Sequence, residues 1–256
     1  MTSSSVVVHR DAEILAQAVA ARLIVRLIDA QANRGSASVV LTGGRIAARI
    51  HAAVRDSPAR EAVDWSAVDF WWGDERFLPS GDPERNETQA REAFLDALPV
   101  DPARVHAMPA SDGPDGDDPE AAASRYAAEL ADSATGDLVL PTFDVLMLGV
   151  GEDGHVASVF PGHPAVYDER DVVAVRGAPK PPPNRISLTQ RAINTAREVW
   201  LVSSGFGKAS AVGLALSGAG PVQVPAAGVQ GTSATRWLLD ADAAVEIPRK
   251  FRSLNT

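Results

Sequence analysis

A histidine stands directly after a glycine-rich loop near the middle of the chain. The apolar residues 145–148 lead into Gly149–Gly154, and His155 follows. We expect a buried strand that ends in this loop and a helix that begins at His155, because α/β proteins bind ligands at such strand ends. A helix N-terminus disfavours the charged imidazole, so the pattern predicts a neutral His155 that acts as a base near pH 7. The alternative is a histidine that is hydrogen-bonded within the loop.

The glycines of this loop also spell G-x-G-x-x-G, the pattern of a dinucleotide-binding turn. Between them stand Glu152 and Asp153, whose negative charges would face a pyrophosphate. We therefore do not expect a dinucleotide here. The histidines show no metal-ligand spacing such as H-E-x-x-H, and no G-x-S-x-G nucleophile pattern occurs, so the sequence predicts no metal site.

Three charged residues follow a second apolar stretch of the chain. They are Asp74, Glu75 and Arg76, and at the end of a strand they would deliver a carboxylate and a guanidinium to a cleft. The alternative is a solvated loop that contains an ion pair worth under about 1 kcal/mol. Asn86 comes soon afterwards and begins a capping-box pattern, so we expect a helix over residues 86–98.

Other cations stand beside turns that are rich in glycine or proline. These segments are Thr42-Gly43-Gly44-Arg45, Lys180-Pro-Pro-Pro-Asn-Arg185 and Ser204-Gly-Phe-Gly-Lys208. A glycine turn between a strand and a helix exposes backbone N–H groups to an anion, and a stiff proline segment would fix Lys180 and Arg185 in space. The alternatives are an ordinary tight turn and a rigid connector with solvated cations. The last turn is not a Walker A loop, because Ala209 follows the lysine.

The composition excludes several classes of protein. The chain has 256 residues, 45% of them hydrophobic, no cysteine, and a net charge of −9 with a pI of about 5.0. The lack of cysteine excludes disulfide scaffolds and thiolate sites, and the acidic balance argues against nucleic-acid binding. No apolar run reaches the roughly 20 residues of a membrane span, and no leader pattern is present, so we expect a cytoplasmic protein.

Strand and helix patterns alternate along the chain and must position these residues. The expected strands are 37–41, 68–73, 145–148, 171–175, 198–203 and 235–239, and the expected helices are 11–30, 46–54, 86–98, 119–131, 190–196 and 209–216. This alternation predicts an α/β fold: a doubly wound, mostly parallel sheet with helices on both faces, as in Rossmann-like three-layer proteins. We see no break in composition and expect residues 1–256 to form a single domain.

Four blocks of the sequence, taken in order, resemble the 6-phosphogluconolactonase family, and the resemblance covers nearly the whole chain. The blocks are Trp72–Arg76, Asn86, Leu148–His155 with Ser158–Pro161, and Lys180–Thr189. The first and third blocks also occur, in looser form, in the glucosamine-6-phosphate deaminases, which have a related fold. Those enzymes carry Asn-Glu-Pro, with a catalytic glutamate, where this chain has Val159-Phe160-Pro161, and this counts against deamination.

The resemblance implies hydrolysis of 6-phospho-D-glucono-1,5-lactone to 6-phospho-D-gluconate in the oxidative pentose phosphate pathway, without a cofactor. His155 is then expected to move a proton from water to the leaving alkoxide, Asp74 to orient His155 or the water, and Arg76 to stabilise negative charge. The expected substrate-binding residues are Thr42, Gly43, Gly44, Arg45, Asn86, Lys180, Arg185 and Lys208. The expected partner is the phosphosugar lactone, with no nucleic acid, membrane or obligate protein partner.

One loop departs from the family pattern. The family usually has Ser-Gly-Gly-Ser-Thr-Pro where this chain has Thr42-Gly-Gly-Arg45-Ile-Ala, so an arginine replaces the hydroxyl donors after the glycines. Arg45 either binds the phosphate itself or points away from it. Two other functions also stay open, namely a sugar-phosphate isomerase or deaminase of the same fold and a sensor that binds a sugar phosphate without turnover.

Overall fold

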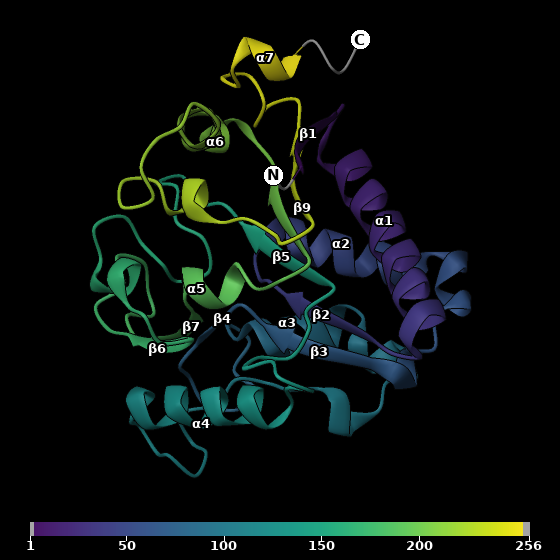
Figure 1. Cartoon of the computed structure of the whole chain (residues 1–256), viewed down its shortest axis with the longest axis vertical. Helices are drawn as coiled ribbons and strands as arrows, with labels where there is room; N and C mark the ends of the chain where they lie inside the picture. The colour runs from purple at the N-terminus through teal and green to yellow at the C-terminus, as the bar shows by residue number, and fades with distance from the viewer. Residues whose placement is uncertain (1–2, 253–256) are drawn as a thin grey trace.

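The computed structural model describes residues 3–252, and a six-stranded sheet forms its centre (Figure 1). The strands lie in the order β1-β9-β8-β5-β2-β3, and every neighbouring pair is parallel. They are β1 (Ser3–His9), β2 (Ala37–Leu41), β3 (Val68–Trp72), β5 (Val145–Gly149), β8 (Glu198–Ser203) and β9 (Ala234–Asp240). This sheet confirms the predicted α/β class.

Helices cover both faces of the sheet, as the doubly wound prediction requires. In Figure 1, α1 and α2 lie on one side of the strands, and α5 and α6 lie on the other. The helices are α1 (Ala12–Arg34), α2 (Arg45–Asp56), α3 (Asn86–Ala93), α4 (Pro119–Asp132), α5 (Gln190–Ile193), α6 (Ala209–Leu216) and α7 (Arg249–Arg252). The Asp11 side chain accepts a hydrogen bond from the Ile14 N–H to start α1, and Gly35, with a φ of 79°, ends it.

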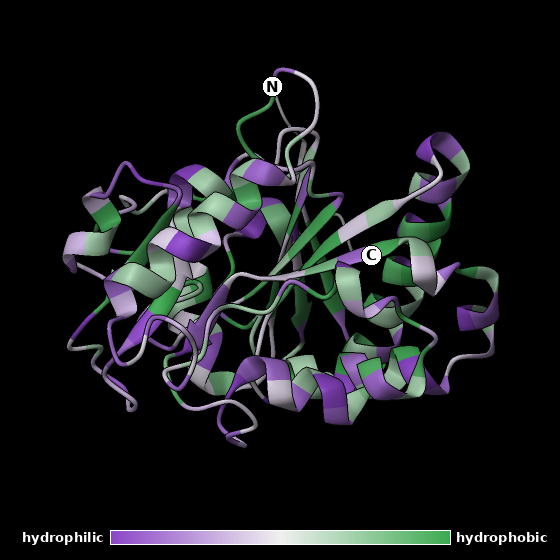
Figure 2. Cartoon of the chain, turned by 90° about the horizontal axis from the view of Figure 1, so that it is seen from below, coloured by the Kyte–Doolittle hydropathy of each residue, from purple (hydrophilic) through white to green (hydrophobic). Residues whose placement is uncertain are grey.

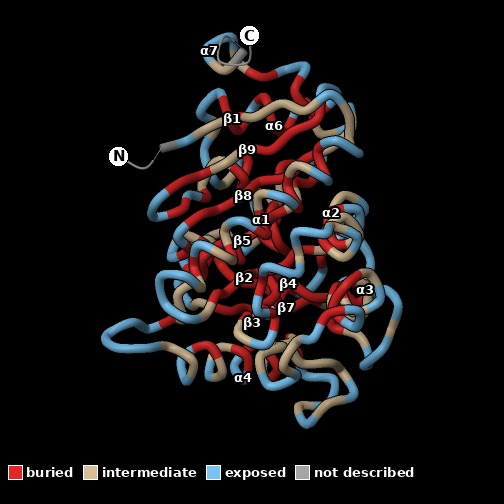
Figure 3. Tube along the Cα trace, turned by 90° about the vertical axis from the view of Figure 1, so that its right-hand side faces the viewer, coloured by how far each residue is buried: buried red, intermediate tan, exposed pale blue. Residues whose placement is uncertain are grey.

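The strands are mostly apolar because both faces of the sheet are covered. All residues of β2 and β8 are buried. Figure 2 shows the central strands in the green of hydrophobic residues, and Figure 3 shows them in the red of buried ones. The largest fully buried side chains include Trp71, Trp72 and Trp200. A densely packed core therefore supports the strand ends.

A second sheet of three antiparallel strands branches off after β3. Its strands, in the order β4-β7-β6, are β4 (Asp74–Arg76), β7 (Arg185–Leu188) and β6 (Val172–Val175). Gly73 turns the chain out of the main sheet: its N–H donates to the Leu41 carbonyl, and its own carbonyl accepts from the Leu188 N–H. The prediction that residues 171–175 belong to the parallel sheet was therefore wrong, and β4 and β7 were not predicted.

Two further expectations differ from the structure. β1 was not predicted, although its apolar residues pair with β9 along the whole strand. The capping box expected at Asn86 is also absent: Arg85 occupies the N-cap position of α3 without a side-chain cap, and α3 ends at Ala93 instead of residue 98. The reason lies in the Glu75 carboxylate, which reaches this helix from β4, as described below.

The strand order creates a crevice at one edge of the sheet. If β2, β3, β5, β8 and β9 are numbered 1 to 5, the parallel strands lie in the order 2-1-3-4-5 across the sheet, and β1 is added beside β9 at the far edge. In this arrangement the connections after β2 and β5 run to opposite sides, and ligands bind where they part, at the carboxyl ends of the strands. The two loops that the sequence analysis singled out, after residues 41 and 149, therefore meet at this point.

His106 lies outside the crevice and makes folding stability depend on pH. Its ring stacks on Trp71 at 3.7 Å, with Nδ1 2.8 Å from Glu129 Oε1 and Nε2 3.2 Å from Asp69 Oδ1. Burial alone would lower the pKa of His106, but the hydrogen bonds to the two carboxylates raise it to about 9.

A folded-state pKa above the unfolded value of about 6.5 means that His106 stabilises the fold fully below pH 6.5 and that this contribution is lost as the pH rises through 9. We expect the free energy of unfolding to fall between pH 6 and pH 10 by on the order of 2 kcal/mol more in the natural protein than in His106→Gln. Urea denaturation at both pH values measures this. Equal pH dependence in the two proteins would show that the pair of ion contacts is not formed.

Candidate active site

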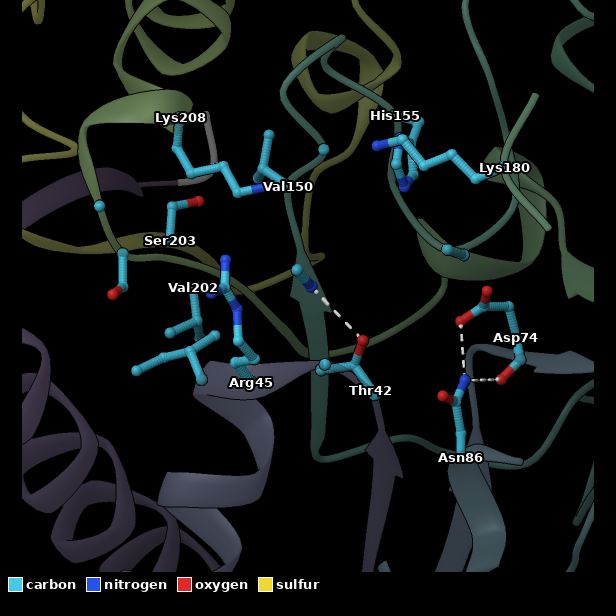
Figure 4. A pocket seen from close by; sticks show the side chains of 18 of the residues that line it. Thr42, Arg45, Asp74, Asn86, Val150, His155, Lys180, Val202, Ser203 and Lys208 are labelled. Atoms are coloured by element: carbon cyan, nitrogen blue, oxygen red, sulfur yellow. Dashed lines mark hydrogen bonds between the residues drawn. The ribbon is translucent and has the colours of Figure 1, made fainter. Parts of the chain in front are cut away.

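A cavity of about 590 Å³ opens at the crevice (Figure 4). Every residue that the sequence analysis assigned to the site lines this one cavity. These residues are Thr42, Gly43, Gly44, Arg45, Asp74, Arg76, Asn86, His155, Lys180, Arg185 and Lys208. They come from the segments that follow β2, β5 and β8, from β4, from the start of α3, and from β7 with the segment before it, so the fold gathers residues that are far apart in the sequence.

His155 does not begin a helix, so that expectation was wrong. The chain forms a tight turn in which the Gly154 N–H donates to the Gly151 carbonyl and the Gly151 N–H donates to the His155 carbonyl. The His155 ring lies 4.5 Å from the ring of Phe160, and its Nδ1 lies 2.5 Å from Asp153 Oδ1. The histidine is therefore hydrogen-bonded within its own loop, which is the alternative that the sequence left open.

Asp153 sets the proton position on this histidine. Burial would raise the pKa of Asp153, but the hydrogen bond with His155 and the charge of that ring outweigh it and hold the pKa well below its usual range. An ionised carboxylate only accepts hydrogen bonds, so the proton of a neutral His155 is on Nδ1 and Nε2 keeps its lone pair. The sequence analysis missed this role and treated Asp153 only as a charge that repels phosphate.

Gly151 leaves the space in which this pair sits. A Cβ at this position would lie 2.0 Å from His155 Nδ1 and 2.3 Å from Asp153 Oδ1. We expect Gly151→Ala to displace the ring and to lower kcat by about 10²-fold or more, because a shift near 1 Å in a reacting group has an effect of this size. Gly220→Ala is the control, since a Cβ there meets nothing within 4 Å and Gly220 does not line the cavity. Equal activity of the two variants in steady-state kinetics would contradict the expected crowding.

Asp74 is held on another wall of the cavity, together with Asn86 (Figure 4). Its Oδ2 accepts a hydrogen bond of 2.7 Å from Ser158 Oγ, and its backbone carbonyl accepts one of 2.8 Å from Asn86 Nδ2. The expectation that Asp74 orients His155 is not met, because the carboxylate bonded to that ring is Asp153. Asp74 remains available to orient a water molecule or a substrate hydroxyl.

Glu75 fixes Asn86 from behind the cavity wall. The Glu75 side chain is fully buried and accepts hydrogen bonds from the backbone N–H groups of Arg76, Asn86 and Glu87. It thereby caps the N-terminus of α3 from a neighbouring strand, which replaces the local capping box. Burial raises the pKa of Glu75 to about 7, against the opposing effects of Arg85 and the three N–H groups. This carboxylate therefore positions the cavity wall and does not face the ligand.

Arg185 is bound to its own segment of the chain. Its Nε donates to the Pro182 carbonyl, and its Nη2 donates to the carbonyls of Lys180 and Pro181. Burial lowers the pKa of Arg185, and its Nη1 lies 4.0 Å from Asp74 Oδ2. Most of its donors are thus occupied, and its main effect is to hold the segment that carries Lys180.

Four other cations at the cavity have no such partners. Within residues 3–252, no hydrogen bond or ion pair involves the side chains of Arg45, Arg49, Lys180 or Lys208. Burial lowers the pKa of Lys208 and the charges of Lys180 and Arg45 lower it further, against the opposing effects of Glu152 and Asp153. Mutually repelling cations around one cavity favour the binding of an anion. Arg49 was missed by the sequence analysis, although its spacing of four residues from Arg45 places both on one face of α2.

Nothing in the described part of the chain suggests a metal site or a membrane span. Among residues 3–252, no group of three or more histidine or acidic residues is arranged to hold a metal ion. In the same range no helix is long and apolar enough to cross a bilayer. The cavity itself offers an imidazole, carboxylates and cations.

Comparisons with known sequences agree on one family. A sequence model described as glucosamine-6-phosphate isomerases/6-phosphogluconolactonase matches residues 10–237. The 6-phosphogluconolactonase of Streptomyces coelicolor is 62% identical over 248 residues, which cover 96% of this chain and 95% of that protein. The 6-phosphogluconolactonase of Mycobacterium tuberculosis is 48% identical over 96% of this chain and 99% of that protein.

Solved structures share the fold over nearly the whole chain. The 6-phosphogluconolactonase from Trypanosoma brucei superposes with a TM-score of 0.79 at 27% identity and covers 97% of this chain and 100% of its own. A monomeric glucosamine-6-phosphate deaminase superposes with a TM-score of 0.77 at 23% identity and covers 94% of this chain and 99% of its own. At that identity the deaminase shows a common fold and nothing about the reaction.

Proposed function

The chain belongs to the glucosamine-6-phosphate isomerase/6-phosphogluconolactonase family, and from this premise we infer that it is a lactonase. It hydrolyses 6-phospho-D-glucono-1,5-lactone to 6-phospho-D-gluconate, a reaction of the pentose phosphate pathway. The observation that carries this conclusion is a histidine oriented by a carboxylate in a cavity lined by unpaired cations. Such a site offers a base for water and a counter-charge for a phosphorylated sugar.

We propose that His155 moves the proton in both steps of the reaction. Nε2 takes a proton from water as the water oxygen attacks the lactone carbonyl carbon, and the carbonyl oxygen becomes an oxyanion. The intermediate then collapses: the carbonyl re-forms, the bond to the ring oxygen breaks, and the imidazolium returns its proton to the departing alkoxide. The product acid loses its own proton to solvent. Asp153 stabilises the transient imidazolium, because its carboxylate is already bonded to Nδ1.

We propose that Arg76 stabilises the oxyanion and that Asp74 orients the attacking water. Arg76 lines the cavity, and its guanidinium is fixed by a hydrogen bond from Nη1 to the Glu84 carbonyl. A fixed positive charge beside a developing oxyanion lowers the barrier, because no reorganisation is needed during the reaction. Asp74, held by Ser158 and Asn86, has a rigid carboxylate that can accept a hydrogen bond from the attacking water.

A direct assay tests the function against its two competitors. We expect acid release from 6-phosphogluconolactone well above spontaneous hydrolysis, and no ammonia release from glucosamine 6-phosphate. The deaminase alternative lacks support at the cavity, since Val159 and Phe160 are buried apolar residues where a catalytic glutamate would be needed. Ammonia release would establish deamination instead, and tight phosphosugar binding without any turnover would establish a sensor.

We also propose that the protein works in the cytoplasm as a single domain without an obligate protein partner. Phosphorylated sugars do not cross membranes unaided, so the enzyme must share a compartment with its substrate. A chain without cysteine suits a reducing compartment. Cell fractionation followed by lactonase assays tests the location.

A further inference from the structure

Ser203, the last residue of β8, presents a hydroxyl that has no partner in the protein. The residue is 2% exposed, and its Oγ forms no hydrogen bond with any part of residues 3–252. It nevertheless lines the cavity, and Figure 4 shows its oxygen pointing into the space beside Lys208 and Arg45. Buried hydroxyls are normally paired, because an unpaired one loses its hydrogen bonds to water without compensation. A hydroxyl in this state at a cavity wall is ready to bond a ligand.

The groups around Ser203 select an anion as that ligand. Arg45 and Arg49 lie one turn apart at the start of α2, which begins after Gly44 without a side-chain cap and without an acidic residue in its first turn. The N-terminus of a helix carries a partial positive charge, which the charges of two nearby arginines repel. An anion bound between the arginines removes this repulsion. Lys208 adds a third cation, which lines the same cavity and whose side chain forms no hydrogen bond or ion pair within residues 3–252.

The loop after β2 offers this region a single hydroxyl. It is that of Thr42, whose Oγ1 accepts a hydrogen bond of 3.4 Å from the Gly149 N–H. The position after the glycines is Arg45. We propose that Ser203, at the end of β8, supplies a hydroxyl donor to the substrate phosphate, which Arg45, Arg49 and Lys208 bind. His155 and Asp74, with Arg76 and Lys180, then surround the lactone end.

This inference rests on the proposed function, and a serine-to-alanine exchange tests it. We expect Ser203→Ala to raise the KM for the phosphorylated lactone about ten- to a hundredfold, the effect of losing a hydrogen bond to a charged group. The kcat/KM for unphosphorylated glucono-1,5-lactone stays unchanged. The melting temperature does not fall, because the hydroxyl bonds nothing in the protein. Ser38→Ala is the matched control, since Ser38 Oγ is also buried and unpartnered but lies in a different cavity.

Calorimetry tests the phosphate subsite independently of the proposed reaction. Titration with 6-phospho-D-gluconate and with D-gluconate measures the preference for the phosphate without any turnover. We expect Ser203→Ala and Arg49→Gln each to reduce this preference at least about tenfold, whereas Ser38→Ala does not. An unchanged preference, or an equal loss of affinity for both ligands, would overturn the subsite. A reduced preference in a protein that hydrolyses no lactone would keep the subsite and refute the proposed reaction.

Discussion

His155→Asn leaves a folded protein whose kcat/KM for 6-phosphogluconolactone is lower by about 10²–10⁴-fold, the usual contribution of a positioned base. Asparagine fills a similar space and keeps a hydrogen bond to Asp153, but it cannot take up a proton. The loss therefore appears mainly in kcat. Steady-state kinetics, corrected for spontaneous hydrolysis, measure it.

His163→Asn is the control for this experiment. His163 lies eight residues further along the chain, and its ring makes structural contacts only: Nδ1 accepts from the Ala165 N–H, and Nε2 lies 3.1 Å from the Arg176 carbonyl. We expect this variant to keep its activity within a few-fold. If His155→Asn retained near-normal activity with an unchanged circular-dichroism spectrum, the base would have to be another group and the mechanism would be wrong.

The sequence identified the cavity because each part of the site is encoded locally. An apolar run followed by glycine and charge marks a strand end, and the carboxyl ends of parallel strands share one edge of the sheet. That reasoning predicts that Arg45, Asp74, His155 and Lys208 follow strand ends, the family resemblance assigns them to one site, and all four line the cavity.

Contacts between residues far apart in the sequence could not be predicted in this way. β4 pairs with β7 so that Arg76 lies opposite Arg185. A hydrophobic pattern within a short segment cannot predict a strand partner so far away in the sequence. Glu75 caps α3 from another strand, so the local capping box at Asn86 was misleading. In both cases tertiary hydrogen bonds override the local pattern, because a buried donor must be satisfied by whichever acceptor reaches it.

The directions of the side chains could not be predicted from the sequence either. Asp153 stands two residues from His155, and only the tight turn, in which Gly151 has no side chain, brings their polar atoms together. The expected helix would have separated them. Likewise, Arg185 was expected to bind substrate, but its guanidinium turns back onto the carbonyls of residues 180–182. A cation in a sequence motif can thus form hydrogen bonds with the backbone of its own segment instead of binding a ligand.

Asp153→Asn tests whether this turn, and not merely the negative charge of the loop, drives the reaction. The amide can present its NH₂ group to Nδ1, which forces the ring proton onto Nε2 and removes the base. We expect kcat to fall by about 10²–10⁴-fold, in line with the loss seen when a triad carboxylate becomes an amide. KM should change little, because Asp153 does not line the cavity and its charge acts on the phosphate subsite only through Lys208.

Glu152→Gln removes the same charge one residue away and is the matched comparison. The Glu152 side chain packs against Gly207 and acts on the charge of Lys208, and it makes no hydrogen bond with His155 within the described residues. Its removal should leave kcat within about twofold and lower KM slightly, since one repulsive charge near the anion is lost. Equal losses of kcat in the two variants would mean that the loop acts through its overall field. A loss confined to Asp153→Asn would assign the effect to the hydrogen bond that fixes the proton on Nδ1.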